Sequence, residues 1–191
     1  METTRFTLGG AVWINLVNTI NKRQIDVLDD PERLMAWLMA NELLRESDQK
    51  ELENKETLRQ ITDVLHSLRN ICFAVLEDFQ QAGLSQSSVQ QLRSLTDPLK
   101  VKLTLHTSEG RLELVNEGLH TDDHITYQVL ASIIHSLQTV SRDRIRACEH
   151  EDCILHFIDT SKSGKRRWCS METCGNRHKA AEFYARKKQK E

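Results

Sequence analysis

Apolar residues recur at helical spacing along most of the first 140 positions of this chain. The clearest pattern covers residues 49–81, which we expect to form one long amphipathic helix. Its apolar residues are separated alternately by three and four positions: Leu58, Ile61, Leu65, Leu68, Cys72, Val75 and Phe79. Gly83 suits the end of this helix because glycine tolerates a left-handed backbone. Asp30 and Pro31 predict the start of an earlier helix, as its N-cap and its first residue.

Shorter elements complete this region. We expect a strand at residues 3–8 and helices at residues 11–21, 85–95 and 121–140, the last capped by Thr121-Asp122-Asp123. Between the last two helices the apolar period falls to two, which is the spacing of a strand with one buried face. The alternating residues are Val101, Leu103 and Leu105, then Leu112 and Leu114 after a turn at residues 107–110. The sequence therefore predicts a half-buried β-hairpin inside a mainly helical region.

Four of the five cysteines lie close together near the C-terminal end, as two C-x4-C pairs separated by fifteen residues: Cys148, Cys153, Cys169 and Cys174. Zn²⁺ takes four thiolates in a tetrahedron, and each close pair can place two sulfurs on one ion. We expect strands at residues 154–158 and 166–168 between the pairs, and a helix at residues 176–188. This order predicts a treble-clef-like module around one structural Zn²⁺. Four thiolates leave no open coordination position, which argues against a catalytic metal.

Several other functions are disfavoured by the sequence. The first ten residues lack the basic and apolar regions of a signal peptide, and no apolar run approaches the roughly 18 residues that span a bilayer. We therefore expect a cytoplasmic protein without a membrane partner, in which the cysteines are reduced and bind zinc rather than form disulfides. Cys72 lies on the apolar side of a predicted helix and reads as a core residue. There is no phosphate loop, HExxH motif or nucleophile–base pairing, so we do not expect an enzyme.

Charge is distributed unevenly along the 191 residues, although the formal net charge is only −2. Residues 142–191 hold 13 Lys and Arg against 8 Asp and Glu, whereas residues 1–141 hold 13 against 20. A basic module on an acidic body indicates a polyanionic partner for the module. The candidate nucleic-acid contacts are Lys165, Arg166, Arg167, Arg177, Lys179, Arg186, Lys187 and Lys188. Arg177 has an alternative role in bracing the metal loop, and Ala180 and Phe183 are expected to dock the last helix onto the preceding hairpin.

Residues 144–188 closely resemble the CGNR zinc finger, whose name is spelled by Cys174-Gly175-Asn176-Arg177. The Arg-Arg-Trp-Cys-Ser-Met block at residues 166–171 belongs to the same likeness. The preceding region resembles the ABATE domain through Gly9-Gly10 and residues 14–19. The resemblance implies a bacterial stress-induced transcription regulator in which the finger binds DNA.

These observations predict a mainly α (α+β) protein of two domains. Residues 1–141 form an ABATE-like helical domain with a β-hairpin, for dimerisation or ligand sensing, and residues 142–191 form a CGNR-type zinc finger for DNA binding. A homodimer and a small-molecule effector are further expected partners. The residues proposed for an effector pocket are Trp13, Asn15, Asn18 and Trp37, with packing as their alternative role. Three alternatives stay open: RNA as the nucleic acid, a finger that recognises a protein, and a thiol-based redox or metal sensor.

Overall fold

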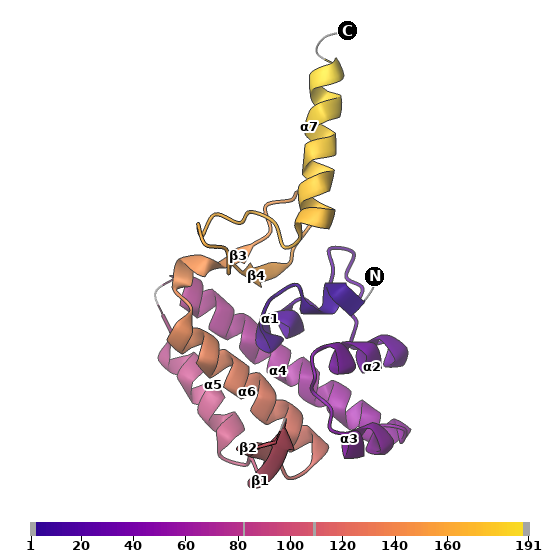
Figure 1. Cartoon of the computed structure of the whole chain (residues 1–191), viewed down its shortest axis with the longest axis vertical. Helices are drawn as coiled ribbons and strands as arrows, with labels where there is room; N and C mark the ends of the chain where they lie inside the picture. Colours follow the sequence, from indigo (N-terminus) through magenta and orange to yellow (C-terminus); the bar gives the residue numbers. More distant parts are fainter. Residues whose placement is uncertain (1–2, 82, 109, 189–191) are drawn as a thin grey trace.

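The computed structural model describes residues 3–81, 83–108 and 110–188, and it is mainly helical with two small antiparallel hairpins (Figure 1). The body comprises the 3₁₀ turn η1 (Thr3–Thr7), α1 (Val12–Val17), α2 (Pro31–Ala40), α3 (Glu46–Glu51), α4 (Lys55–Gln81), α5 (Gln86–Thr96), β1 (Val101–Ser108), β2 (Arg111–Gly118) and α6 (Thr121–Thr139). The C-terminal module comprises η2 (Arg142–Arg144), β3 (Ile145–Ala147), β4 (His156–Ile158), the π-helical turn η3 (Met171–Gly175) and α7 (Asn176–Lys188). The predicted fold class is confirmed.

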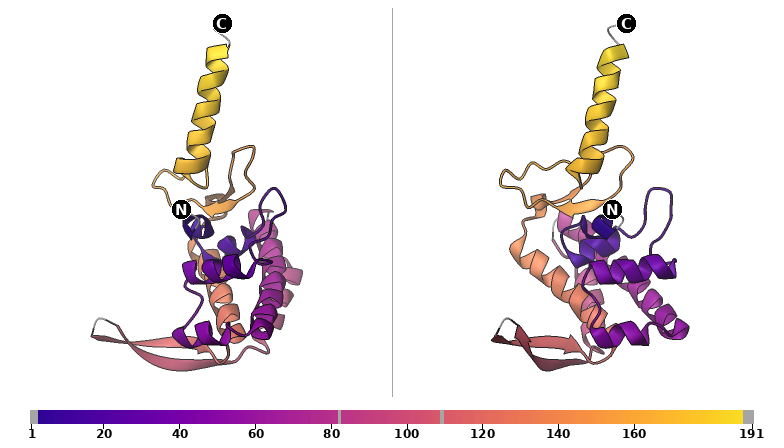
Figure 2. Two further views of the ribbon diagram at one scale, coloured as in Figure 1. Left: turned by 90° about the vertical axis from the view of Figure 1, so that its right-hand side faces the viewer. Right: turned by 45° about the vertical axis from the view of Figure 1, so that its right-hand side comes forward.

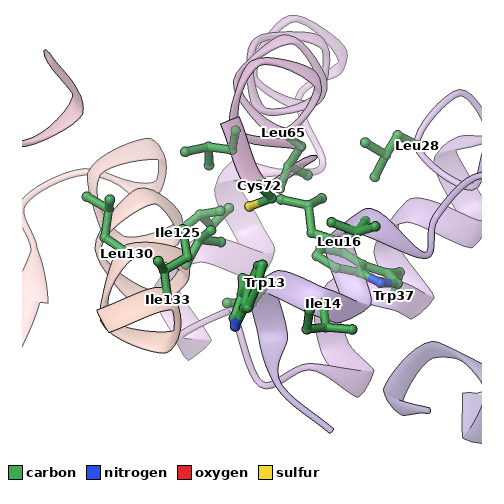
Figure 3. Close-up of a cluster of buried hydrophobic side chains, with 14 of the residues drawn as sticks. Trp13, Ile14, Leu16, Leu28, Trp37, Leu65, Cys72, Ile125, Leu130 and Ile133 are labelled. Carbon is green, nitrogen blue, oxygen red and sulfur yellow. The ribbon is translucent and has the colours of Figure 1, made fainter. Parts of the chain in front are cut away.

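The core of the body forms where α1 lies between α4 and α6 (Figure 3). Trp13 of α1 is fully buried, and its indole Nε1–H donates to Ser136 Oγ on α6 at 2.9 Å. Cys72 and Leu65 of α4 and Ile133 of α6 belong to the same buried cluster. A helix as short as α1 is unstable in isolation, so its conformation depends on being enclosed by the two long helices.

Three of the predicted helix boundaries are confirmed at a capping side chain or a glycine, whereas α6, expected to be capped from Thr121, has His120 as its N-cap. Asp30 caps α2 because its carboxylate accepts hydrogen bonds from the backbone N–H groups of Glu32 and Arg33, at 3.0 and 3.2 Å. Gly83 follows α4 with a φ of 107°, a conformation that L side chains rarely adopt. Ser85 caps α5 in the same manner as Asp30 caps α2.

Several local predictions in the body are wrong. The helix expected at residues 11–21 spans only Val12–Val17. Residues 3–7 form the turn η1 rather than a strand, and Phe6 from this turn packs into the core. Residues 49–81 form two helices, because α3 ends at Glu51 and α4 begins at Lys55. Asn54 explains the break, since its side-chain oxygen accepts from the backbone N–H of Glu56 at 2.8 Å and so starts a new helix.

The predicted β-hairpin is present, with Leu105 paired opposite Leu114, but its apolar face is not half-buried. Leu105 is 62% exposed and Leu114 67% exposed. The hairpin is anchored only at its base, where Arg45 Nη1 donates to the carbonyl of Gly118 at 2.6 Å, and it projects sideways from the body (Figure 2). Glu109 of the expected turn lies outside the described residues.

Strand pairing in the C-terminal module also differs from the prediction. β4 pairs with β3, which precedes the first cysteine, and residues 166–168 form no strand. Asp159 is the physical reason. Its carboxylate accepts from the backbone N–H groups of both Ser161 and Arg166 at 2.9 Å, which folds the segment after β4 into a loop.

The C-terminal module is docked on the body through β4. Asn18, at the end of α1, donates through its amide nitrogen to the carbonyl of His156 and accepts from the His156 N–H, both at 2.8 Å. The next residues alternate in direction, as a strand requires. Ile158 packs into the core of the body, whereas Phe157 packs among the cysteines. The β3–β4 hairpin is therefore shared between the two units.

Among the helices in the described part of the chain, none combines the length and the apolar character needed to cross a membrane.

Candidate metal centre and nucleic-acid interface

The four cysteines of the C-terminal module converge on one point. Cys148 follows β3, Cys153 precedes β4, Cys169 precedes η3 and Cys174 lies within η3. Their four sulfur atoms all lie within 4.8 Å of one another, and the Cys153–Cys169 and Cys169–Cys174 sulfurs are 3.7 Å apart. A Zn–S bond of about 2.3 Å in a tetrahedron places neighbouring sulfurs about 3.8 Å apart. The sulfurs are therefore spaced for a single Zn²⁺.

Short backbone turns hold each cysteine in place. Cys148 N–H donates to the carbonyl of Leu155 at 2.8 Å, and Cys153 N–H donates to the carbonyl of His150 at 2.9 Å, which closes the loop between the first pair. The second pair is closed by η3, where Gly175 N–H donates to the carbonyl of Ser170 at 3.1 Å. A Cβ on Gly175 would approach the Met171 sulfur to 2.5 Å, so a larger residue there would displace the flexible Met171 side chain.

The thiols also require a compensating positive charge. A hydrogen bond from Cys169 lowers the pKa of Cys153 to about 5, so one sulfur of the group ionises readily. Burial and the neighbouring Cys153 thiolate raise the pKa of Cys174 to about 11, and the hydrogen bond to Cys153 together with burial raises that of Cys169. Four thiolates at these separations repel one another. A divalent cation removes that repulsion and ionises all four thiols.

The sulfur cluster takes the place of a hydrophobic core in the module. Its buried residues are Phe157 and three of the cysteines, and Trp168 and Leu155 pack against them only partly buried. So few apolar groups stabilise a fold of this size weakly, whereas structural zinc contributes roughly 10–16 kcal/mol of apparent binding energy in comparable modules.

One of the predicted nucleic-acid contacts, Arg166, faces inward and braces the metal loop. Its Nε donates to the carbonyl of Trp168 at 2.8 Å, its Nη2 donates to the carbonyl of Cys169, and its guanidinium lies 4.5 Å from the centroid of the Phe157 ring. The guanidinium of Arg166 is therefore engaged by the backbone on either side of Cys169 and is not free to contact a nucleic acid. Arg166 thus has a bracing role of the kind that the sequence suggested for Arg177.

The other predicted contacts are exposed: Lys165, Arg167, Arg177, Lys179, Arg186, Lys187 and Lys188. Arg167 pairs with Glu149 at 2.5 Å and lies over the ring of Trp168. Five of the seven lie on α7, which touches η3 at its base and otherwise projects from the molecule (Figures 1 and 2). The expectation that Ala180 and Phe183 dock this helix is wrong, because both are exposed, Phe183 by 61%.

Four basic residues of α7 occupy two opposite faces, and Lys187 lies between these faces. Lys179 and Arg186 are seven residues apart, and Arg177 and Lys188 are eleven apart, close to two and three helical turns at 3.6 residues per turn. Each pair therefore shares one face, and the two faces point in nearly opposite directions. A helix with cations on two opposite faces can contact two anionic surfaces at once.

Two family models match the chain. The model of the ABATE family, described as "Putative stress-induced transcription regulator", matches residues 10–145, and that of the CGNR zinc finger matches residues 144–187. The chain belongs to the ABATE family. No curated protein is similar to it. The match of the zinc-finger model and the close grouping of Cys148, Cys153, Cys169 and Cys174 support zinc binding by this chain.

Within the ABATE domain, three of the residues proposed for an effector pocket lie in the core. Trp13 and Trp37 are fully buried. Asn15 accepts from Gly9 N–H at 2.8 Å through its side-chain oxygen and holds the N-terminal turn against α1. The fourth, Asn18, is engaged with β4 and borders a cavity between the ABATE domain and the finger.

This interdomain cleft has a volume of about 620 Å³. The ABATE domain contributes four cations to its lining and the finger contributes one: Arg5, Lys22, Arg23, Arg33 and Arg177. Cys153, Cys169 and Cys174 border the same space, as does Asp152, which pairs with Lys22 at 3.2 Å. The sequence analysis did not predict this cluster, because four of its five cations lie within residues 1–141, which carry a net negative charge. The adjacent Lys22 and Arg23 were the one signal of a local positive charge.

We predict that replacing one sulfur removes the metal. The zinc content of the Cys169→Ser variant should be about one tenth or less of that of the unaltered protein, because serine supplies no thiolate to the site. Zinc per chain is measured with a chromogenic chelator after thiol modification. Lowering the pH should also release zinc, because protons compete with the ion for the thiolates.

The control is Cys72→Ala, which removes the buried thiol of α4 and should leave about one zinc ion per chain. Equal zinc content in Cys169→Ser and Cys72→Ala would contradict the assignment of the ligands.

Proposed function

We propose that this protein is a DNA-binding transcription regulator in which one structural Zn²⁺ holds α7 in position to contact DNA. The exposed helix with cations on two opposite faces is the observation that carries the proposal. Its thirteen residues correspond to about 20 Å of helix, and the major groove of B-DNA, about 12 Å wide, admits an α-helix. Cations on both sides of such a helix can reach the phosphates that border the groove.

The loop between the cysteine pairs extends this basic surface. Lys165 and Arg167 are exposed, and Arg167 can exchange its partner Glu149 for a phosphate, which forms a bidentate hydrogen bond with a guanidinium. Arg166 supports the surface indirectly, because it braces the loop that carries Cys169. We assign no catalytic residue, and we place the protein in the bacterial cytoplasm, where DNA is present and thiols stay reduced.

A second group of potential metal ligands is formed by Asp26, Asp29 and His66. Its chemistry does not call for a second metal ion. Arg69 donates to Asp26 Oδ2 at 2.6 Å and contacts His66 Nδ1 at 2.8 Å. Its guanidinium already supplies the positive charge at that position, so this group reads as a structural ion pair between α4 and the loop before α2.

Neutralising two cations at the end of α7 should weaken DNA binding without unfolding the finger. We expect Lys187→Gln with Lys188→Gln to reduce affinity for duplex DNA about tenfold near 0.1 M salt and to lower the slope of log K against log salt by about 2, since each phosphate contact contributes about 0.9. Fluorescence anisotropy across a salt series measures both quantities.

The matched control carries Lys50→Gln and Lys55→Gln, two exposed lysines at α3 and the start of α4. This variant has the same net charge but should retain the salt slope of the unaltered protein. Equal losses in both variants would mean that overall charge, rather than α7, determines binding. Stronger binding to a matched RNA would assign the finger to RNA.

We further propose that the interdomain cleft holds a small anionic effector, which would make the ABATE domain the sensory part. Its cations come from both units, so an anion bound there would bridge Arg23 of the body and Arg177 at the start of α7. Such a bridge would restrain the finger relative to the body, and effector binding would thereby alter DNA affinity.

Inorganic phosphate is a suitable probe for this cleft. It should raise the thermal midpoint of the protein at constant ionic strength, and Arg23→Gln should reduce that rise by at least half because the variant removes one of the lining cations. The control Arg59→Gln removes an exposed arginine of α4 and should retain the full rise. The same response in both variants would remove the cleft as the anion site.

A further inference from the structure

The hairpin formed by β1 and β2 leaves one face uncovered. The register places the side chains of Val101, Leu103 and Leu105 of β1 on the same face as Leu112 and Leu114 of β2. All five are exposed, by 47%, 65%, 62%, 68% and 67% respectively. We call this set the apolar hairpin face. The hairpin projects from the helical body at the end opposite to α7, and among the described helices none covers this face (Figures 1 and 2).

The two faces of the hairpin differ sharply in charge. Among the described residues of the apolar hairpin face, none is charged, and its other members are Thr107, Asn116 and Gly118. The charged side chains lie on the opposite face, where Glu117 accepts from Thr104 Oγ1 at 3.0 Å, contacts His106 Nε2 at 2.9 Å and pairs with Lys102. On the opposite face, Glu117 is therefore satisfied by its neighbours on the hairpin. The apolar hairpin face can be buried without desolvating a charge.

The exposed area is large for a monomer. Five aliphatic residues exposed to this extent present on the order of 600 Å², which is the upper end of the largest apolar patch on a typical monomer. It also approaches the roughly 800 Å² that each partner contributes to a stable protein interface. A hairpin of two strands is marginal in water unless a second layer packs on its apolar side. The hairpin would therefore be stabilised by a second layer packed on its apolar face.

We propose that a second copy of this chain supplies that layer, with the two apolar hairpin faces packed against each other across a two-fold axis. A two-fold interface uses the same surface on both partners, which suits a neutral apolar face because it brings no like charges together. Leu105 and Leu114 lie opposite each other in the register, near the middle of the face, and would form the centre of the contact.

The shape of the molecule favours this occupant. Because the hairpin extends beyond the helices, two copies can stack their hairpins without a collision between their bodies (Figure 2). The result is a four-stranded, two-layer sandwich with its sheets about 10 Å apart. Each hairpin then gains the second layer that its own chain does not provide. This inference does not depend on DNA binding, and either proposal can fail without the other.

The test is the mass of the protein in solution as a function of concentration. Sedimentation equilibrium of the zinc-loaded full-length chain should give twice the chain mass of 22.1 kDa. The double variant Leu105→Glu with Leu114→Glu should raise the dissociation constant at least about 100-fold, because it removes the centre of the contact and places like charges across the axis. Both positions face solvent in the single chain, so the variant should fold, which its helical circular dichroism would verify.

The matched control carries Arg111→Gln and Glu113→Gln, at positions on the opposite face of the same strand, and should remain dimeric. A chain mass of 22.1 kDa for the unaltered protein at every concentration up to about 100 µM would overturn the proposal. A dimer that persists in the folded Leu105→Glu, Leu114→Glu variant would also overturn it, because the two copies would then meet through another surface.

Discussion

The convergence of four thiols on one point is the constraint on which the C-terminal module of this protein depends. A module with Phe157 and the cysteines as its buried residues has little hydrophobic free energy of its own. We propose that one zinc ion supplies that free energy, which requires that two separate loops and the π-helical turn η3 bring their sulfurs together. The start of α7 is thereby fixed, because Cys174 lies immediately before it. A helix that buries none of its described residues is held at one end by its connection to a metal centre.

The position of this centre relative to the body is set by a second, smaller group of contacts. Asn18 forms both amide hydrogen bonds with the backbone of His156, and Gly9 accepts a hydrogen bond from Ile158 N–H at 2.9 Å. The side chains of β4 alternate in direction, so that Phe157 packs among the cysteines of the finger and Ile158 packs into the core of the body. The ABATE domain and the finger thus share a structural element. This shared strand is the physical basis on which a ligand in the interdomain cleft could influence the finger.

The sequence determined those parts of the structure that follow from local chemistry. Cysteine spacing, the cap at Asp30, the stop at Gly83 and the hairpin register all depend on near neighbours, and they could be predicted. The break at Asn54 could have been recognised from the same capping chemistry, but the apolar period across residues 49–81 concealed it. Periodicity alone also could not show which face of the hairpin is covered, because burial depends on what the rest of the chain places beside it.

Long-range contacts account for the other differences. Arg166 and Arg167 are neighbours in a basic run, yet one braces the carbonyl of Cys169 and the other remains at the surface. Trp13 and Asn15 carry polar groups suited to a pocket, but α4 and α6 enclose Trp13, and Asn15 bonds to Gly9 and Asn41. Four of the five cations that line the cleft come from residues 5–33, far from the finger in sequence. Where a polar side chain points is decided by tertiary packing, which a single sequence does not reveal.

Whether the finger recognises specific DNA sequences when it holds zinc can be measured by genomic selection. Purified protein is incubated with sheared genomic DNA at roughly physiological salt, once loaded with zinc and once after removal of the metal, and the retained fragments are sequenced. Binding through phosphates alone weakens steeply with salt, so the account predicts that the zinc-loaded protein retains a small number of discrete loci and that metal removal abolishes this enrichment. Uniform retention across the genome, or the same loci with and without zinc, would contradict it.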